Sequence, residues 1–237
     1  MYHYKSFFSY LRQILRKKRL IIIHIGHHKT ATTSIQRFLF SHRQTLASYG
    51  ILYPSSGLFG ETGQHNLAWE LSGDDRFSAE NGTVSDLLGE LQRSEAKLAI
   101  LSSEDLEYLV QAPRSLSDFQ RKLTSIGFEP IYLAVFRDCQ SYAESLFNEL
   151  LKHGLQMSRQ TFMDEITTKE SFTTEQNWHF EFNRKRFERN WNEMTGCKLA
   201  ALPYNHADML TPFLKFIGAP QSLINESISA HRFNARS

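Results

Sequence analysis

The chain has 237 residues, of which 41% are hydrophobic and 13% aromatic, so it is long and apolar enough to bury one full core. Its formal net charge is +2, yet residues 1–19 hold six of the 27 Lys and Arg and no acidic residue, which leaves residues 20–237 with a net charge of −4. We expect a single domain over residues 20–237. Because that domain is acidic and has no basic and aromatic stripe, we expect no nucleic-acid partner.

Residues 1–19 form a basic segment with apolar residues at helical spacing. A helix that lies on a membrane surface has this pattern, and so has a short helix packed on the domain. The apolar run at residues 20–25 is far shorter than the ~20 residues of a membrane span, and the segment lacks the apolar core of a signal peptide. We expect a cytoplasmic protein, with peripheral contact to the inner membrane surface through residues 1–19 as one alternative.

The first strongly apolar run, residues 20–25, predicts a buried strand, and an apolar-periodic helix is predicted from Ile35 onward. The residues between them are Gly26, His27, His28, Lys29, Thr30, Ala31, Thr32, Thr33 and Ser34. Three features of this segment together favour binding of an anion: a glycine that permits a sharp turn, the free amides of a helix start, and the helix dipole. Lys29 adds a positive charge, so we predict a phosphate-binding loop. The alternative is an ordinary Thr-capped helix with a solvated lysine.

A second candidate site follows the strand predicted over residues 131–136. Arg137 ends this strand, a helix follows, and Ser145 lies eight residues after Arg137, so both side chains can face one crevice. A guanidinium suits a phosphate because its planar fork donates two parallel hydrogen bonds. Alone, such a pair is usually a surface arginine and a helix serine. Here both the pair and the Lys29 loop follow a predicted strand, which makes the prediction of a phosphate site more specific.

The common nucleotide-triphosphate loop needs a Gly-Lys-Ser/Thr sequence, which this chain lacks. Residues 29–34 (Lys-Thr-Ala-Thr-Thr-Ser) instead resemble the Lys-Thr-Gly-Thr-Thr-Ser loop of sulfotransferases that use 3′-phosphoadenosine 5′-phosphosulfate (PAPS). Arg137 and Ser145 match the spacing of that family's 3′-phosphate site. Ala31 stands where the family carries glycine, which is tolerable only if this backbone position does not need a positive φ.

The resemblance implies a P-loop-hydrolase-like fold, PAPS as a co-substrate bound by residues 26–34, Arg137 and Ser145, and no required metal. It also implies transfer of a sulfuryl group to a hydroxyl of a carbohydrate or glycolipid acceptor. Two alternatives stay open: a nucleotide-dependent phosphotransferase of P-loop type, and a catalytically silent binding module on a membrane surface.

Sulfuryl transfer needs a group that stabilises the leaving phosphate and a base for the acceptor hydroxyl. Lys29 is the candidate for the leaving-group contact, and His65 and Glu104 compete as the base. His65 precedes a predicted helix, whereas Glu104 follows a predicted strand, at the edge where α/β sheets bind ligands. The alternatives are a helix-start histidine and a first-turn glutamate stabilised by the helix dipole. The sequence leaves the choice of base open.

Strand and helix signals alternate along the chain, which predicts an α/β three-layer sandwich with a central parallel sheet flanked by helices. Helices are predicted over residues 80–95 and 115–125, strands over 97–102, 129–136 and 198–204, and a short extended piece over 50–54. Residues 158–195 are predicted to be an insertion, helical at both ends, near the acceptor site. His24, His27 and His28 lack metal-site spacing and the two cysteines lack close partners, so we expect neither a metal site nor a disulfide. His27 and His28 are expected to line the loop.

Overall fold

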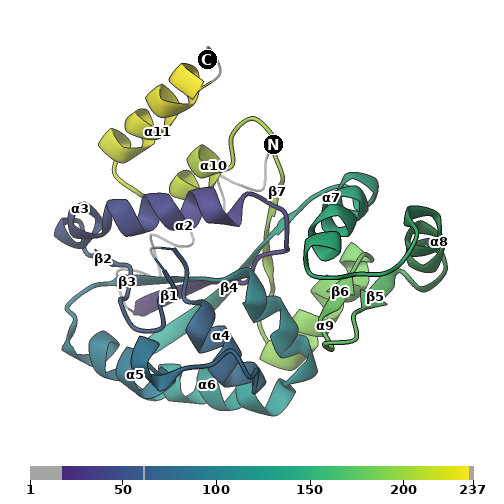
Figure 1. Ribbon diagram of the computed structural model, residues 1–237. Helices are drawn as coiled ribbons and strands as arrows, with labels where there is room; N and C mark the ends of the chain where they lie inside the picture. Colours follow the sequence, from purple (N-terminus) through teal and green to yellow (C-terminus); the bar gives the residue numbers. More distant parts are fainter. Residues whose placement is uncertain (1–17, 61, 235–237) are drawn as a thin grey trace.

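A parallel sheet of five strands, in the order β2-β3-β1-β4-β7, forms the centre of the computed structural model, which describes residues 18–60 and 62–234 (Figure 1). The strands are β1 (Arg19–His24), β2 (Ile51–Leu52), β3 (Leu98–Ser102), β4 (Phe128–Phe136) and β7 (Ala200–Pro203). The central strand, β1, pairs with β3 in the register Leu20↔Leu98 and with β4 in the register Arg19↔Phe128. The predicted parallel sheet is thereby confirmed.

Helices cover both faces of this sheet (Figure 1). One face carries α2 (Thr32–Ser41), α3 (Arg43–Ser48), α10 (Leu210–Phe216) and α11 (Gln221–Asn234). The other carries α4 (His65–Ser72), α5 (Val84–Arg93), α6 (Pro113–Ser125) and α9 (Arg184–Thr195). Successive side chains of a strand point to opposite faces, so Ile21 and Ile23 pack under the second set, while Leu20 and Ile22 pack under the first. The predicted three-layer α/β sandwich is confirmed.

A smaller hydrophobic cluster lies beside the sheet and includes Leu146, Phe162, Phe172 and Phe180. It is built from α7 (Cys139–Lys152), α8 (Arg159–Lys169), β5 (Ser171–Thr173) and β6 (His179–Glu181). Residues 158–195 thus have the predicted helices at both ends, α8 and α9, but an antiparallel β5–β6 hairpin lies between them. That hairpin was not predicted, because three residues per strand are too few for an alternating pattern to stand out.

The predicted helix over residues 80–95 is divided into η1 (Ala79–Asn81) and α5, and a 3₁₀ helix, η2 (Glu104–Gln111), follows β3. Within residues 18–60 and 62–234, each helix is too short or too polar to cross a bilayer. The predicted amphipathic segment lies outside the described residues except for Lys18 and Arg19.

The loops after β1 and β4 leave the same edge of the sheet. From β1 the chain continues to β2 and β3, which lie on one side of β1, whereas β4 and β7 lie on the other side. The strand order therefore reverses between β1 and β4. The loop after β1 lies against the end of β4, since the Val135 amide donates to the Gly26 carbonyl over 3.2 Å. Open α/β sheets bind ligands at such a point.

Candidate functional site

The loop after β1 has a positive φ at Gly26, Lys29 and Ala31, whereas the sequence predicted a sharp turn only at Gly26. Gly26 has a φ of 80°, and a Cβ there would lie 2.5 Å from the Cα of Glu104, so only glycine fits between β1 and η2. Lys29 and Ala31 also have positive φ, 61° and 63°. Alanine was expected to be tolerable at this position only if the backbone did not need a positive φ, and this condition is not met. Ala31 therefore has a conformation that is costly for a residue with a Cβ.

The start of α2 is open toward the site. Its N-cap residue, Ala31, provides no side-chain cap, and the Thr32 hydroxyl is buried without a hydrogen-bond partner among the described residues. A helix start without a cap keeps amide donors available and carries the positive end of the helix dipole. This end of α2 can therefore bind an anion.

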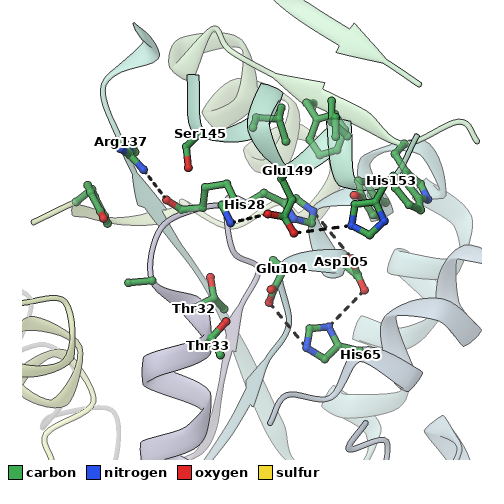
Figure 2. A pocket seen from close by; sticks show the side chains of 18 of the residues that line it. His28, Thr32, Thr33, His65, Glu104, Asp105, Arg137, Ser145, Glu149 and His153 are labelled. Atoms are coloured by element: carbon green, nitrogen blue, oxygen red, sulfur yellow. Dashed lines mark hydrogen bonds and ion pairs between the residues drawn. The ribbon is translucent and has the colours of Figure 1, made fainter. Parts of the chain in front are cut away.

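One cavity of about 470 Å³ brings the two predicted phosphate sites together (Figure 2). Lys29, Thr32 and Thr33 line it from the β1 loop and α2, and Arg137 and Ser145 line it from the end of β4 and from α7. Arg137 is fixed there, because its Nη1 donates to the Lys29 carbonyl over 3.2 Å and its Nε donates to the Ser141 hydroxyl over 2.8 Å. Segments more than a hundred residues apart thus supply one site with two cationic side chains.

Other residues of the loop turn their side chains away from this cavity. The buried Thr30 hydroxyl donates to the His27 carbonyl over 2.5 Å. The His27 ring lies in the interior, 4.4 Å from the ring of Tyr142, and burial lowers its pKa to about 3. His27 and His28 were both expected to line the loop. Only the His28 side chain lines the cavity, whereas the His27 side chain points into the interior. Gly26 and Ser34 also lie outside the cavity lining.

Lys29 is ion-paired inside the cavity. Its Nζ lies 3.1 Å from Oε2 of Glu149, a residue of α7. The same Oε2 lies 2.8 Å from the Nζ of Lys152. The hydrogen bond from Lys152, and then the one from Lys29, outweigh partial burial and lower the pKa of Glu149 to about 2. This carboxylate is therefore charged at neutral pH.

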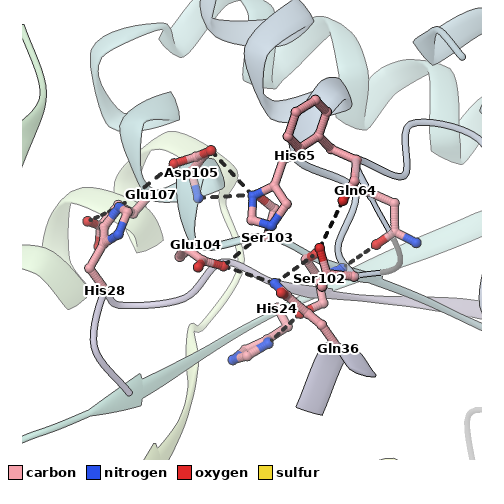
Figure 3. Close-up of polar contacts among 12 residues, drawn as sticks. His24, His28, Gln36, Gln64, His65, Ser102, Ser103, Glu104, Asp105 and Glu107 are labelled. Atoms are coloured by element: carbon pink, nitrogen blue, oxygen red, sulfur yellow. Dashed lines mark hydrogen bonds and ion pairs between the residues drawn. The ribbon is translucent and has the colours of Figure 1, made fainter. Parts of the chain in front are cut away.

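Both candidate bases face the same cavity (Figure 2), and Figure 3 shows the polar contacts around them. The Nδ1 of His65 lies 3.3 Å from Asp105 Oδ2 and 3.0 Å from the Ser103 hydroxyl, while its Nε2 lies 3.9 Å from Glu104 Oε2. Burial by itself lowers the pKa of His65, but the hydrogen bond with Asp105 and the charges of Glu104 and Asp105 outweigh burial and raise it. Glu104 is held from α2, since Gln36 Nε2 donates to its Oε2 over 2.9 Å.

The segment before α4 sets the position of His65. The Gln64 amide donates to the Ser102 carbonyl over 2.9 Å, and the Ser102 amide donates to Gln64 Oε1 over 2.8 Å. A Cβ on Gly63 would lie 2.4 Å from the Ser102 carbonyl oxygen. The chain therefore packs tightly against the end of β3, which brings His65 to η2.

His28, which lines the cavity, pairs with a buried carboxylate. His28 Nε2 is 3.3 Å from Oε1 of Glu107, a side chain that is 3% exposed. Burial, and then the charges of Asp105 and Glu104, raise the pKa of Glu107 well above its ordinary value. Burial also lowers the pKa of His28. Both shifts favour the neutral form of the group, so neither favours an added net charge beside the anion site.

Several residues of the cavity were not predicted. Asp105 and Glu149 contact the predicted catalytic groups, and Arg76, Tyr108, Trp178 and Phe180 also line the cavity. Two of them could have been found from their spacing in the sequence. Asp105 adjoins Glu104, and Glu149 follows Ser145 by four residues, which places Ser145 and Glu149 on one side of a helix.

In the part of the chain that the structure describes, no group of three or more His, Cys, Asp or Glu side chains could hold a metal ion. Cys139 and Cys197 are free thiols. Comparisons with protein-family models, with curated proteins and with solved structures gave no match. Function is therefore inferred from the residues and the geometry of the cavity.

Proposed function

We propose that the protein is a sulfotransferase that moves a sulfuryl group from PAPS to a hydroxyl of a carbohydrate or glycolipid. The observation that carries this proposal is the convergence of two separate anion-binding groups on one cavity: Lys29 with the start of α2, and Arg137 with Ser145. A nucleotide with phosphates on both its 5′ and 3′ oxygens needs two such groups. In this proposal β1, the loop after it and α2 act as a P-loop-like unit that binds the 5′ end of the nucleotide.

In this proposal the 5′-phosphosulfate lies at the start of α2, where Lys29, Thr32 and Thr33 donate hydrogen bonds to its oxygens. The 3′-phosphate lies against Arg137 and Ser145. Because the Lys29 carbonyl and Ser141 hold the guanidinium in place, little side-chain entropy is lost when the phosphate binds.

His65 is the proposed base. When its Nδ1–H is donated to Asp105, its Nε2 has a free lone pair that takes the proton of the acceptor hydroxyl. The acceptor oxygen then forms a bond to sulfur, the bond between sulfur and the bridging oxygen breaks, and its electron pair stays on the 5′-phosphate. Lys29 and the α2 amides stabilise the charge that develops on this leaving group. Glu104 lies beside Nε2 and favours the imidazolium that forms.

The aromatic residues of the cavity lining support a carbohydrate or glycolipid acceptor. Tyr108, Trp178 and Phe180 line the cavity, and the apolar face of a sugar ring packs well on aromatic rings. Arg76 adds a guanidinium 4.8 Å from the Trp69 ring and 5.2 Å from the Trp178 ring. Hydroxyl groups of a sugar can accept hydrogen bonds from it.

Calorimetric binding of adenosine 3′,5′-bisphosphate, 5′-AMP and Mg·ATP tests this function. We expect strong preference for the bisphosphate, followed by sulfuryl transfer when PAPS and a panel of glycans are supplied. Preference for Mg·ATP would favour the phosphotransferase. Binding of none of the three would favour the silent module.

A further inference from the structure

Glu149 places a negative charge beside Lys29, the residue proposed to bind the 5′-phosphosulfate of the nucleotide. It lies on α7 four residues after Ser145, and its carboxylate is 3.1 Å from the Lys29 Nζ. Figure 2 shows the Glu149 side chain on the cavity wall formed by α7, facing the β1 loop. A terminal group held by Lys29 therefore lies close to this carboxylate.

The carboxylate keeps partners when Lys29 turns to a ligand. Lys152 Nζ lies 2.8 Å from Oε2 of Glu149, and His153 Nε2 lies 3.8 Å from its Oε1. Lys152 is the last residue of α7 and His153 is its C-cap, so a nucleotide that takes Lys29 does not leave Glu149 unpaired. The negative charge thus stays in place while the nucleotide is bound.

We propose that Glu149 is a specificity-determining residue, which makes the site prefer a terminal sulfuryl group over a terminal phosphoryl group. This inference rests on the proposed function, because it takes the terminal group of the nucleotide to lie at Lys29. The two groups have the same tetrahedral shape and three outer oxygens. They differ in charge, since near pH 8 a terminal phosphoryl carries about one negative charge more than a sulfuryl.

An opposing charge is needed for such a preference. Lys29 and the positive end of α2 by themselves attract the more negative phosphoryl group more strongly. Repulsion by a carboxylate about 5 Å away changes the relative affinity about tenfold, even after screening by solvent and by Lys152. Glu149 is placed to supply that repulsion without blocking the donors of α2.

The test compares PAPS with its phosphoryl isostere, adenosine 3′-phosphate 5′-diphosphate, by calorimetry near pH 8, without magnesium or acceptor. Glu149→Gln should raise affinity for the isostere about tenfold more than affinity for PAPS. Lys152→Gln, which removes a screening cation, should shift the ratio of the two affinities in the opposite direction. Glu149→Asp keeps the charge and should keep most of the wild-type ratio.

Glu165→Gln is the matched control, because it removes one carboxylate from α8, where Glu165 pairs with Lys169, outside the cavity. It should leave the ratio unchanged. The ratio is taken within one protein sample, so partial loss of folded protein affects both nucleotides equally. An identical ratio in the wild type and in Glu149→Gln would overturn this inference and leave the sulfotransferase proposal intact. A wild-type protein that binds neither nucleotide would reject both.

Discussion

Ala31 carries backbone strain at the point where the loop becomes α2. Its φ of 63° and ψ of 26° are left-handed, a conformation that costs a residue with a Cβ about 1 kcal/mol relative to glycine. We predict that Ala31→Gly raises the free energy of unfolding by about that amount, measured by urea denaturation.

Ala47→Gly gives the control, because Ala47 is exposed in the ordinary helical backbone of α3. It should lower the free energy of unfolding by about 0.5–1 kcal/mol. If both substitutions destabilised the protein, Ala31 would not have the positive φ described above.

The pKa of His65 should set the acid limb of the pH–rate profile. Burial opposes the shift, but the hydrogen bond with Asp105 and the charges of Asp105 and Glu104 raise the pKa of His65 above its ordinary value. The base must be unprotonated, so kcat/KM should fall as pH drops through this raised pKa, above the value of about 6.5 of a free histidine.

Asp105→Asn removes the main partner of His65, so the acid limb should move to lower pH and the plateau should fall about tenfold or more. Asp118→Asn, which changes an exposed carboxylate on α6, should leave the profile unchanged. An acid limb that stays in place in Asp105→Asn would point to Glu104 as the base.

Arg137 should act on the 3′-phosphate alone. We predict that Arg137→Ala weakens calorimetric binding of adenosine 3′,5′-bisphosphate by about tenfold or more, because a charge-assisted hydrogen bond is lost. Binding of 5′-AMP should change much less. Arg121→Ala, an exposed substitution on α6, should change neither. Equal losses for the two nucleotides would remove Arg137 from the 3′-phosphate site.

At the scale of elements, the contact between Gly63 and the end of β3 decides where α4 begins. A Cβ on Gly63 would meet the Ser102 carbonyl at 2.4 Å and Gln36 Nε2 at 2.6 Å. We predict that Gly63→Ala costs about 1–3 kcal/mol of stability and lowers transfer activity more than nucleotide affinity, because it moves His65 away from Asp105.

Gly89→Ala is a useful comparison for this prediction. The new Cβ would meet the mobile guanidinium of Arg93 at 3.1 Å within α5. It should therefore leave activity intact and leave stability unchanged or slightly higher. Similar losses in the two variants would mean that the contact at Gly63 has no special role.

The elements differ in how far the sequence predicts them. β1, β3 and β4 were predictable because strands buried on both faces are continuous apolar runs. Lys29, His65 and Glu104 could be proposed as site residues because each lies at a strand end or helix start, and all three line the cavity. Asp105 and Arg76 acquire their places only when α4 and η2 pack together, and the β5–β6 hairpin is stabilised by contacts with α7 and α8. Such long-range packing leaves no local pattern.

At the scale of the whole molecule, the cavity joins segments that are distant in sequence, so a ligand there should stabilise the fold. Adenosine 3′,5′-bisphosphate at about 100 times its Kd should raise the free energy of unfolding by about 2.7 kcal/mol. Thermal unfolding with and without the nucleotide measures this. The gain should shrink in Arg137→Ala at the same concentration, and a wild-type protein with no gain would contradict binding to the native state.

The central place of β1 has a consequence for biosynthesis. Its partners begin 78 residues later, at Leu98 opposite Leu20, and 109 residues later, at Phe128 opposite Arg19. At about 5–20 residues per second, the ribosome needs on the order of ten seconds to complete both neighbours. Both edges of β1 lack a partner until β3 is complete, and one edge lacks a partner until β4 is complete. The nascent chain should therefore depend on chaperones until β4 has emerged.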